Sequence, residues 1–249
     1  MDQRTRVGPA TVAGNVRTAV VWEVLSAVVT EAGRSLVVVD AGGGTGGFAV
    51  PLAEAGHQVT VVDPSPDSLA ALERRAAERS LDVAALQGDL SDLPSLVAAG
   101  SVDLVLCHSV LEVVDDPAAA LADLAGVLAP GGRLSLLVAN RDAAVLARAL
   151  AGRPEEAAHA LTDPAGRWGP ADGTSRRWTP AAVSALVTGA GLVVEQLHGV
   201  RTVSDLVPSV VLDTEPGAAA AFLALERALS DRAPFRDLAT QLHVLARKA

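Results

Sequence analysis

The fold of this chain is decided by the stretch Val37-Val38-Val39-Asp40-Ala41-Gly42-Gly43-Gly44-Thr45-Gly46-Gly47. A run of β-branched valines is typical of a buried strand in a parallel sheet. The glycines that follow permit positive φ angles and leave space where a side chain would block a ligand. The stretch therefore predicts a buried strand that ends in a loop able to cradle a nucleotide.

Two nucleotide ligands fit this loop. The spacing Asp40-x-Gly42-x-Gly44-x-Gly46 is the form that the loop takes when it binds S-adenosylmethionine (SAM). Gly42, Gly44 and Gly47 also satisfy G-x-G-x-x-G, the pattern of dinucleotide-binding loops. The residues around the loop must therefore decide between SAM and a dinucleotide such as NAD.

Composition narrows the class of protein. The chain has 249 residues, 50% of them hydrophobic, and we expect residues 1–249 to form one domain. A net charge of −9 argues against a generally basic surface for nucleic acid. The single cysteine, Cys107, excludes a disulfide framework and a cysteine metal cluster, so we expect no metal. Residues 1–6 are polar and no apolar run is long enough to span a membrane, which predicts a cytoplasmic protein.

Strand and helix patterns alternate along the first 140 residues. This alternation predicts an α/β, Rossmann-like fold with a mostly parallel, seven-stranded sheet and helices on both faces. The expected strands are 36–40, 58–62, 82–86, 102–107, 133–139, 192–197 and 238–246. The expected helices are an N-terminal helix over 14–31, then 48–55, 66–80, 117–128, 180–189 and 217–230.

The pattern loosens between positions 140 and 178. A short helix rich in arginine and alanine is expected there, followed by an exposed loop over residues 163–174. The segment lies after the fifth expected strand, at the edge where ligands bind in such sheets. We therefore interpret residues 140–178 as an insertion on the substrate side.

Asp63 ends the second expected strand, where an acid accepts hydrogen bonds from the ribose hydroxyls of SAM or of NAD. The alternative is a helix cap, a role that Ser65 or Asp67 could also fill. Gly88-Asp89 follows the third strand, where an acid faces the exocyclic amine of adenine in a SAM site. The alternative for Asp89 is a local Asx-turn.

The acids favour SAM over NAD. An NAD site has less need of Asp89, and Asp40 would repel a pyrophosphate but can hold the amino-acid end of SAM through the loop. His108, at the end of the fourth strand, could contact the cofactor, contact the substrate, act as a general base, or be a satisfied polar residue. Arg17 could pair with the carboxylate of SAM or lie on a solvated helix face.

Together these residues resemble a class I SAM-dependent methyltransferase. The resemblance rests on residues 40–47, Asp63, Asp89, residues 102–112 and residues 128–137. A narrower resemblance, to the bacterial tRNA 5-carboxymethoxyuridine methyltransferase family, covers nearly the whole chain. The stretches that carry it are 16–22, 40–44, 56–59, 108–112, 134–136, Asn140, 199–201 and 243–248.

That family esterifies a carboxylate on the wobble uridine of tRNA, which makes tRNA the implied partner. The resemblance implies SAM contacts at Arg17, Gly42, Gly43, Asp63, Gly88, Asp89 and His108, beside Asp40 and Gly44 of the loop. It also implies a substrate-side role for Arg201, whose alternative is a salt bridge with Asp205, and we assign Asn140 to the same side.

The chain departs from this family where the partner would bind. Members carry a lysine-rich stretch between the fifth and sixth strands, where this chain offers Arg167, Arg176 and Arg177. There is no tyrosine to stack on a base, and the net charge is −9. Three alternative functions therefore stay open: a small-molecule O- or N-methyltransferase, an NAD-dependent oxidoreductase, and a SAM-binding protein without catalysis.

Overall fold

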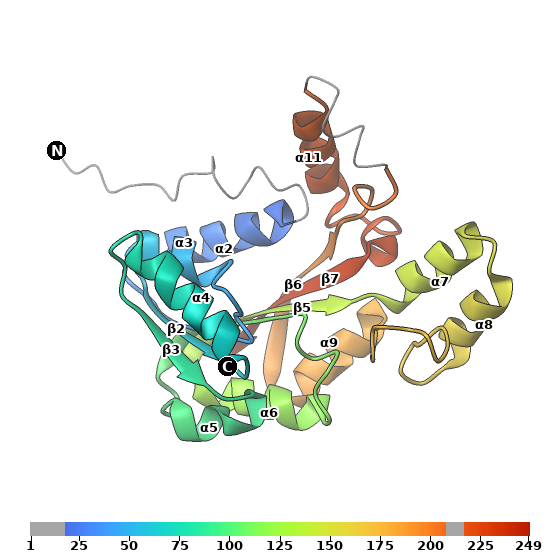
Figure 1. The fold of residues 1–249 in the computed structure, drawn as a ribbon. Helices are drawn as coiled ribbons and strands as arrows, with labels where there is room; N and C mark the ends of the chain where they lie inside the picture. The colour runs from blue at the N-terminus through green and yellow to red at the C-terminus, as the bar shows by residue number, and fades with distance from the viewer. Residues whose placement is uncertain (1–17, 208–216) are drawn as a thin grey trace.

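The computed structural model describes residues 18–207 and 217–249. Within them, seven strands form one sheet in the order β3-β2-β1-β4-β5-β7-β6 (Figure 1). The strands are β1 (Val37–Ala41), β2 (Gln58–Asp63), β3 (Val83–Gln87), β4 (Val102–His108), β5 (Leu128–Ala139), β6 (Leu192–Val200) and β7 (Gln241–Lys248). The expected Rossmann-like, mostly parallel sheet is confirmed.

The directions of the strands place the loops that follow β1 to β5 at one edge of the sheet. β1 pairs in parallel with β2 and β4, β2 with β3, and β4 with β5, whereas β7 runs antiparallel to both β5 and β6. The carboxyl ends of the first five strands therefore meet at the same edge. The chain reverses its direction of travel across the sheet between β1 and β4, which is where open α/β sheets bind ligands.

Helices cover both faces of the sheet, as Figure 1 shows. α2 (Ala19–Ala32), α3 (Ala49–Glu54) and α4 (Pro66–Ala77) pack on one face, with Leu25, Leu72 and Leu104 in the core between them. On the other face, α6 (Pro117–Val127) and α9 (Pro180–Gly189) bury Leu124 and Val187. The central strands are buried on both sides, which is why they read as continuous apolar runs.

The insertion differs from its prediction. It contains α7 (Arg141–Leu150) and a second helix, α8 (Pro154–Thr162), which project together beside the sheet (Figure 1). Pro154 occupies the first turn of α8, where its missing N–H costs nothing, and this start was overlooked. The following segment is also not simply an exposed loop, because Asp172 is buried and Trp178 pairs with Asn140 beside β5.

Smaller differences have local causes. β5 begins at Leu128 and not at the expected position 133, so that it includes Pro130-Gly131-Gly132. The last strand begins at Gln241, because residues 236–238 form a short 3-10 helix, η2 (Arg236–Leu238). The third crossover contains two unpredicted elements, η1 (Leu90–Asp92) and α5 (Leu93–Leu96), and α11 (Ala218–Leu229) lies within its expected range. Residues 14–17 of the expected first helix lie outside the described residues.

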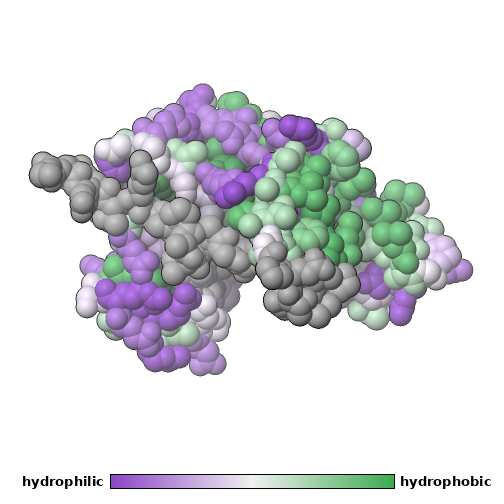
Figure 2. All heavy atoms as spheres, turned by 90° about the horizontal axis from the view of Figure 1, so that it is seen from above, coloured by the Kyte–Doolittle hydropathy of each residue, from purple (hydrophilic) through white to green (hydrophobic). Residues whose placement is uncertain are grey.

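Hydrophobic residues gather in the right half of the face in Figure 2, where α11 and α7 lie. The large exposed side chains of these two helices are Leu146, Leu150 and Leu225. Among the described residues, no helix is long and apolar enough to cross a membrane.

Candidate active site

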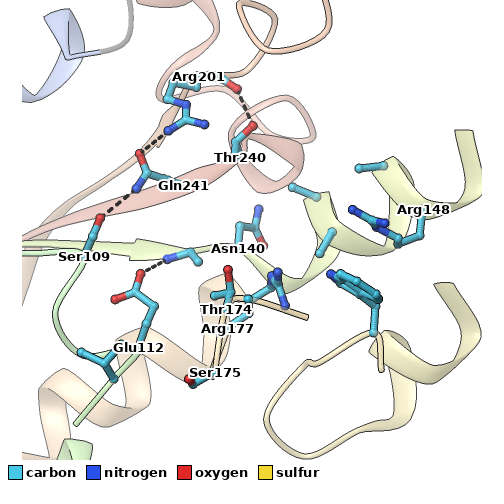
Figure 3. Close-up of a pocket in the computed structure, with 17 residues that line it drawn as sticks. Ser109, Glu112, Asn140, Arg148, Thr174, Ser175, Arg177, Arg201, Thr240 and Gln241 are labelled. Carbon is cyan, nitrogen blue, oxygen red and sulfur yellow. Dashed lines mark hydrogen bonds between the residues drawn. The ribbon is translucent and has the colours of Figure 1, made fainter. Parts of the chain in front are cut away.

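Two adjacent pockets open at the carboxyl edge of the sheet. The first, which we call the Asp89 pocket, has a volume of about 370 Å³ and includes Gly42, Gly88, Asp89 and Val110 in its wall. The second, the Arg201 pocket, has a volume of about 430 Å³ and is drawn in Figure 3. Val113 lines both pockets, so a ligand in one would lie next to a ligand in the other.

The glycine loop begins in the wall of the Asp89 pocket, at Gly42. Gly42 has a φ of +76°, and a Cβ at this position would collide with Val110 just beyond β4. A Cβ on Gly43 would lie 2.6 Å from the carboxylate of Asp40. The glycines are therefore required by the close approach of the loop to its own strand and to the exit of β4.

Asp63 lies at the end of β2 and holds the glycine loop. Its Oδ2 accepts the N–H of Gly44 and its Oδ1 the N–H of Ser65, both at 2.9 Å. Ser65 caps α4 by accepting the N–H of Ser68 at 3.2 Å, so the capping role belongs to Ser65. Each carboxylate oxygen of Asp63 retains a second lone pair for a ligand.

Asp89 makes a local turn and also lines a pocket. Its Oδ1 accepts hydrogen bonds from the hydroxyl of Ser91 at 2.6 Å and from the N–H of Ser91 at 2.7 Å. These bonds lower the pKa of Asp89, the hydroxyl bond most, so the group is ionised at neutral pH. The two interpretations of Asp89 are thus compatible, because an Asx-type cap presents a carboxylate to the Asp89 pocket.

Asp40 is buried beneath the glycine loop, with 3% of its surface exposed. Burial raises the pKa of Asp40 to about 7, and the nearby charge of Asp63 adds to the increase. Ionising this carboxyl in the ligand-free protein therefore costs free energy. A cation bound over the loop would offset that cost.

His108 begins a buried chain of hydrogen bonds. Its Nε2 lies 2.9 Å from the hydroxyl of Ser135, which in turn lies 2.8 Å from Nε2 of His243. Burial lowers the pKa of His108 to about 3, which makes it a weak base at neutral pH. The side chain packs edge-on against Phe48 and is not among the residues that line either pocket.

Arg201 makes the salt bridge with Asp205 that was its alternative interpretation. It lines the Arg201 pocket, and its Nε donates to Asp205 at 2.8 Å. Its Nη1 donates to Oε1 of Gln241 at 3.4 Å. The buried carboxylate of Glu226, on α11, accepts the backbone N–H groups of residues 202–204 and so fixes the loop that carries Arg201.

The far wall of the Arg201 pocket comes from the insertion (Figure 3). The guanidinium of Arg148 lies 4.3 Å from the ring centroid of Trp168, in a cation–π contact. Arg148 shares the carboxylate of Glu156 with Arg153, at 3.2 and 2.9 Å. One acid thus faces two cations, which leaves this part of the pocket positively charged.

Asn140 is a positioning residue at the end of β5. Its Oδ1 accepts the N–H of Asp142 at 3.0 Å, and its Nδ2 donates to the carbonyls of Asp237 and Ala239 at 2.8 and 2.7 Å. With 1% of its surface exposed, it ties the start of α7 to the segment before β7. Arg17, the remaining predicted contact, lies outside the described residues.

Among the residues of the Arg201 pocket that were not predicted as site residues are Ser109, Glu112 and Gln241. Ser109 and Glu112 follow β4 directly, so their place at the ligand edge could have identified them. Glu112 is buried and accepts the N–H of Ala139 at 2.7 Å, and burial raises its pKa. Within the described residues, no group of three or more His, Cys, Asp or Glu side chains could hold a metal ion.

Comparison with known proteins identifies the family. Residues 39–136 match the family model described as a methyltransferase domain. The chain is 31% identical to the tRNA 5-carboxymethoxyuridine methyltransferase of Escherichia coli (strain K12), over 96% of this chain and 90% of the relative. The chain belongs to this methyltransferase family. It is a SAM-dependent methyltransferase, and Gly42, Gly88 and Asp89 in the wall of the Asp89 pocket fit that cofactor.

The chain is also similar to other methyltransferases, in sequence or in fold. It is 34% identical to the ubiquinone biosynthesis O-methyltransferase of Xanthomonas axonopodis pv. citri, over 71% of this chain and 70% of the relative. Its fold is similar to that of a SAM-dependent methyltransferase from Mesorhizobium loti, with a TM-score of 0.62, 21% identity and coverage of 95% and 100% of the two chains. The magnesium protoporphyrin IX methyltransferase of Synechocystis PCC 6803, solved with bound SAH, gives a TM-score of 0.61 at 18% identity, covering 95% and 84%.

Asp63→Ala is expected to weaken SAM binding by about 100-fold or more, because the variant lacks the carboxylate that we predict to accept the ribose hydroxyls. Isothermal titration calorimetry measures this affinity, and circular dichroism checks that the fold is retained. Asp67→Ala, which removes an exposed acid from the first turn of α4, is the matched control. Unchanged affinity in the Asp63 variant would contradict the ribose assignment.

Asp40→Asn is expected to stabilise the ligand-free protein in a pH-dependent way. The pKa of Asp40 is about 7 in the fold against an ordinary value of 3.8, so ionisation opposes folding increasingly from about pH 4 to about pH 7. The gain in Tm from Asn should therefore be small near pH 4 and largest above about pH 7. Thermal unfolding across this range measures it, and a gain independent of pH would refute the buried-carboxyl account.

Proposed function

We propose that the methyltransferase esterifies the carboxylate of 5-carboxymethoxyuridine at the wobble position of tRNA. The observation that carries this proposal is the Arg201 pocket, which adjoins the Asp89 pocket and is lined by Arg148, Arg177, Arg201 and Trp168. Guanidinium groups suit a carboxylate and a tryptophan face suits a base. The likeness to the Escherichia coli enzyme over 96% of the chain supports the same acceptor.

In this proposal the cofactor lies across the carboxyl ends of β1 to β4. Asp89 accepts from the adenine amine, Asp63 from the ribose hydroxyls, and Asp40 faces the amino-acid end of SAM through the loop Gly42–Gly44. Gly88 completes the adenine wall. The proposed contacts of Arg17 and His108 rest on the family resemblance.

The charge balance of the Arg201 pocket supports an anionic acceptor. Arg177 is paired with Asp172, through Nη2 and Oδ1 at 2.9 Å, and Arg201 is paired with Asp205. Arg148 lies beside Arg153 and shares one acid with it. A carboxylate entering the pocket would complete this balance. Trp168, one face of which is covered by Arg148, lines the same pocket.

The proposed reaction requires little acid–base catalysis by the protein. Bound SAM supplies a methyl group on a positively charged sulfur, and an acceptor carboxylate is already ionised at neutral pH. A carboxylate oxygen of the acceptor would take this methyl group, forming a C–O bond as the C–S bond of SAM breaks, and no proton would have to be removed. The residues of the two pockets act by holding and aligning the reactants, a contribution worth roughly 7–11 kcal/mol. The low pKa of His108 agrees with a reaction that needs no general base.

We infer that residues 140–178 form the substrate-side part of a single domain over residues 1–249. This segment contains six arginines and five acidic residues, whereas the whole chain has a net charge of −9. The insertion is therefore the less acidic part of an acidic protein, and an RNA would meet the least repulsion there.

A second candidate function is methylation of a small molecule at oxygen. It is favoured by the likeness to the ubiquinone biosynthesis O-methyltransferase and by the acidity of the chain outside the insertion. An alcohol or phenol acceptor would need a base, however, and the pKa of His108 does not suit that role. We therefore place the carboxylate acceptor first.

Transfer of labelled methyl from SAM to bulk tRNA of the source organism tests the proposal. The expected product carries label that nuclease digestion solubilises and that mild alkali releases, because a methyl ester hydrolyses where an N- or C-methyl group does not. Label in a small-molecule fraction, with none on RNA and with SAM binding confirmed on the same preparation, would favour the second candidate.

Arg201→Ala is expected to raise the KM for the acceptor at least about tenfold while the Kd for SAM changes little, because the guanidinium lines only the Arg201 pocket. Steady-state kinetics and calorimetry measure the two quantities. The control is Arg232→Ala, which removes an exposed arginine outside both pockets. An equal loss of affinity for the acceptor and for SAM would contradict the assignment of Arg201 to the substrate site.

A further inference from the structure

Two residues that border the Arg201 pocket have strained backbones. Ser109, just after β4, has a φ of +58°, and Arg201, just after β6, has a φ of +63°. Residues with a Cβ rarely adopt this left-handed conformation, and such strain persists only where the surrounding structure imposes it. Their side chains meet at Gln241 on β7, which bridges them in Figure 3.

Arg201 determines which way the bridging amide faces. A guanidinium can only donate hydrogen bonds, so the Gln241 atom opposite Nη1 of Arg201 must be the carbonyl oxygen Oε1, 3.4 Å away. The amide nitrogen Nε2 then faces Oγ of Ser109, at 3.0 Å. Because an amide nitrogen is only a donor, Ser109 must be the acceptor in that bond.

The hydroxyl proton of Ser109 is therefore available to another partner. Within the described residues, Oγ of Ser109 makes one hydrogen bond, which it accepts from Gln241. The residue is exposed and lines the Arg201 pocket, while the next residue, Val110, lines the Asp89 pocket. The hydroxyl thus stands at the boundary between the two pockets, as a donor without a described acceptor.

We infer that Ser109 donates its hydroxyl proton to the carboxylate of the methyl acceptor, and that Gln241 is the positioning residue that turns this hydroxyl toward the pocket. The inference rests on the proposed function, because it names a carboxylate as the ligand. Ser109 and Arg201 hold one carboxylate oxygen by hydrogen bonds, and the other oxygen keeps a lone pair for the methyl group. Binding by donors also excludes neutral uridines that lack the carboxylate.

Two substitutions remove the hydroxyl with different effects on the backbone. Ser109→Gly suits the positive φ, whereas Ser109→Ala keeps a Cβ in the strained conformation. Both are expected to lower kcat/KM for an anticodon stem–loop carrying 5-carboxymethoxyuridine by about 10- to 100-fold, with an unchanged Kd for SAM. Thermal unfolding verifies that Ser109→Gly is folded, so an activity loss shared by both variants cannot come from backbone strain.

Gln241→Glu tests the direction of the hydroxyl. A carboxylate at this position accepts from Arg201 and also from Ser109, so it draws the hydroxyl proton away from the pocket. We expect a loss of kcat/KM in the otherwise unchanged enzyme and little additional loss in the Ser109→Gly background. Repulsion between the new charge and the acceptor would instead lower activity equally in both backgrounds, and that result overturns the role assigned to Gln241.

The outcomes separate this inference from the proposed function. Transfer by the unsubstituted enzyme to the stem–loop, with full activity retained in Ser109→Gly, overturns the inference and leaves the proposed function intact. Absence of transfer by the unsubstituted enzyme, on a preparation that binds SAM, overturns both. Transfer that falls in both Ser109 variants, with SAM affinity unchanged, supports both.

Discussion

The packing of the glycine loop against the exit of β4 is the constraint on which both pockets depend. Gly42 approaches Val110 so closely that no side chain fits between them, and Asp63 holds the loop from the other side through Gly44. This contact closes one wall of the Asp89 pocket and sets where residues 109–113 turn toward the Arg201 pocket. A cofactor and its acceptor can therefore meet at one point of the sheet edge, which is what in-line methyl transfer requires.

Most arginines that line the Arg201 pocket are paired with an acid. Arg177 and Arg201 each face an acid, whereas Arg148 shares its acid with another arginine. Paired guanidinium groups are held in place before a ligand arrives, so little ordering is left to be done on binding. An acidic protein can in this way present a pocket for an anion without a broadly basic surface, which reconciles the net charge of −9 with a carboxylate acceptor.

The sequence predicted the sheet better than the second pocket, for physical reasons. Strands buried on both faces, such as residues 37–41, leave continuous apolar runs, and parallel strands place their ends at a common edge. Both roles of Asp89, in the local cap and in the pocket wall, could be considered from the local sequence pattern alone. The bridge from Ser109 to Gln241 spans 132 positions and depends on the antiparallel pairing of β5 with β7, which no local pattern contains. The start of α8 at Pro154 was missed although local signals mark it, because Pro154 occupies the first turn and Glu155 and Glu156 follow it there.

The central claim is that donor and acceptor occupy adjoining pockets on the two sides of Val113. A crystal structure with S-adenosylhomocysteine and an anticodon stem–loop carrying 5-carboxymethoxyuridine tests it most directly. The account predicts adenine in the Asp89 pocket and the uridine carboxylate in the Arg201 pocket, within hydrogen-bond reach of Ser109. A uridine bound elsewhere on the surface, with the Arg201 pocket empty, would contradict it.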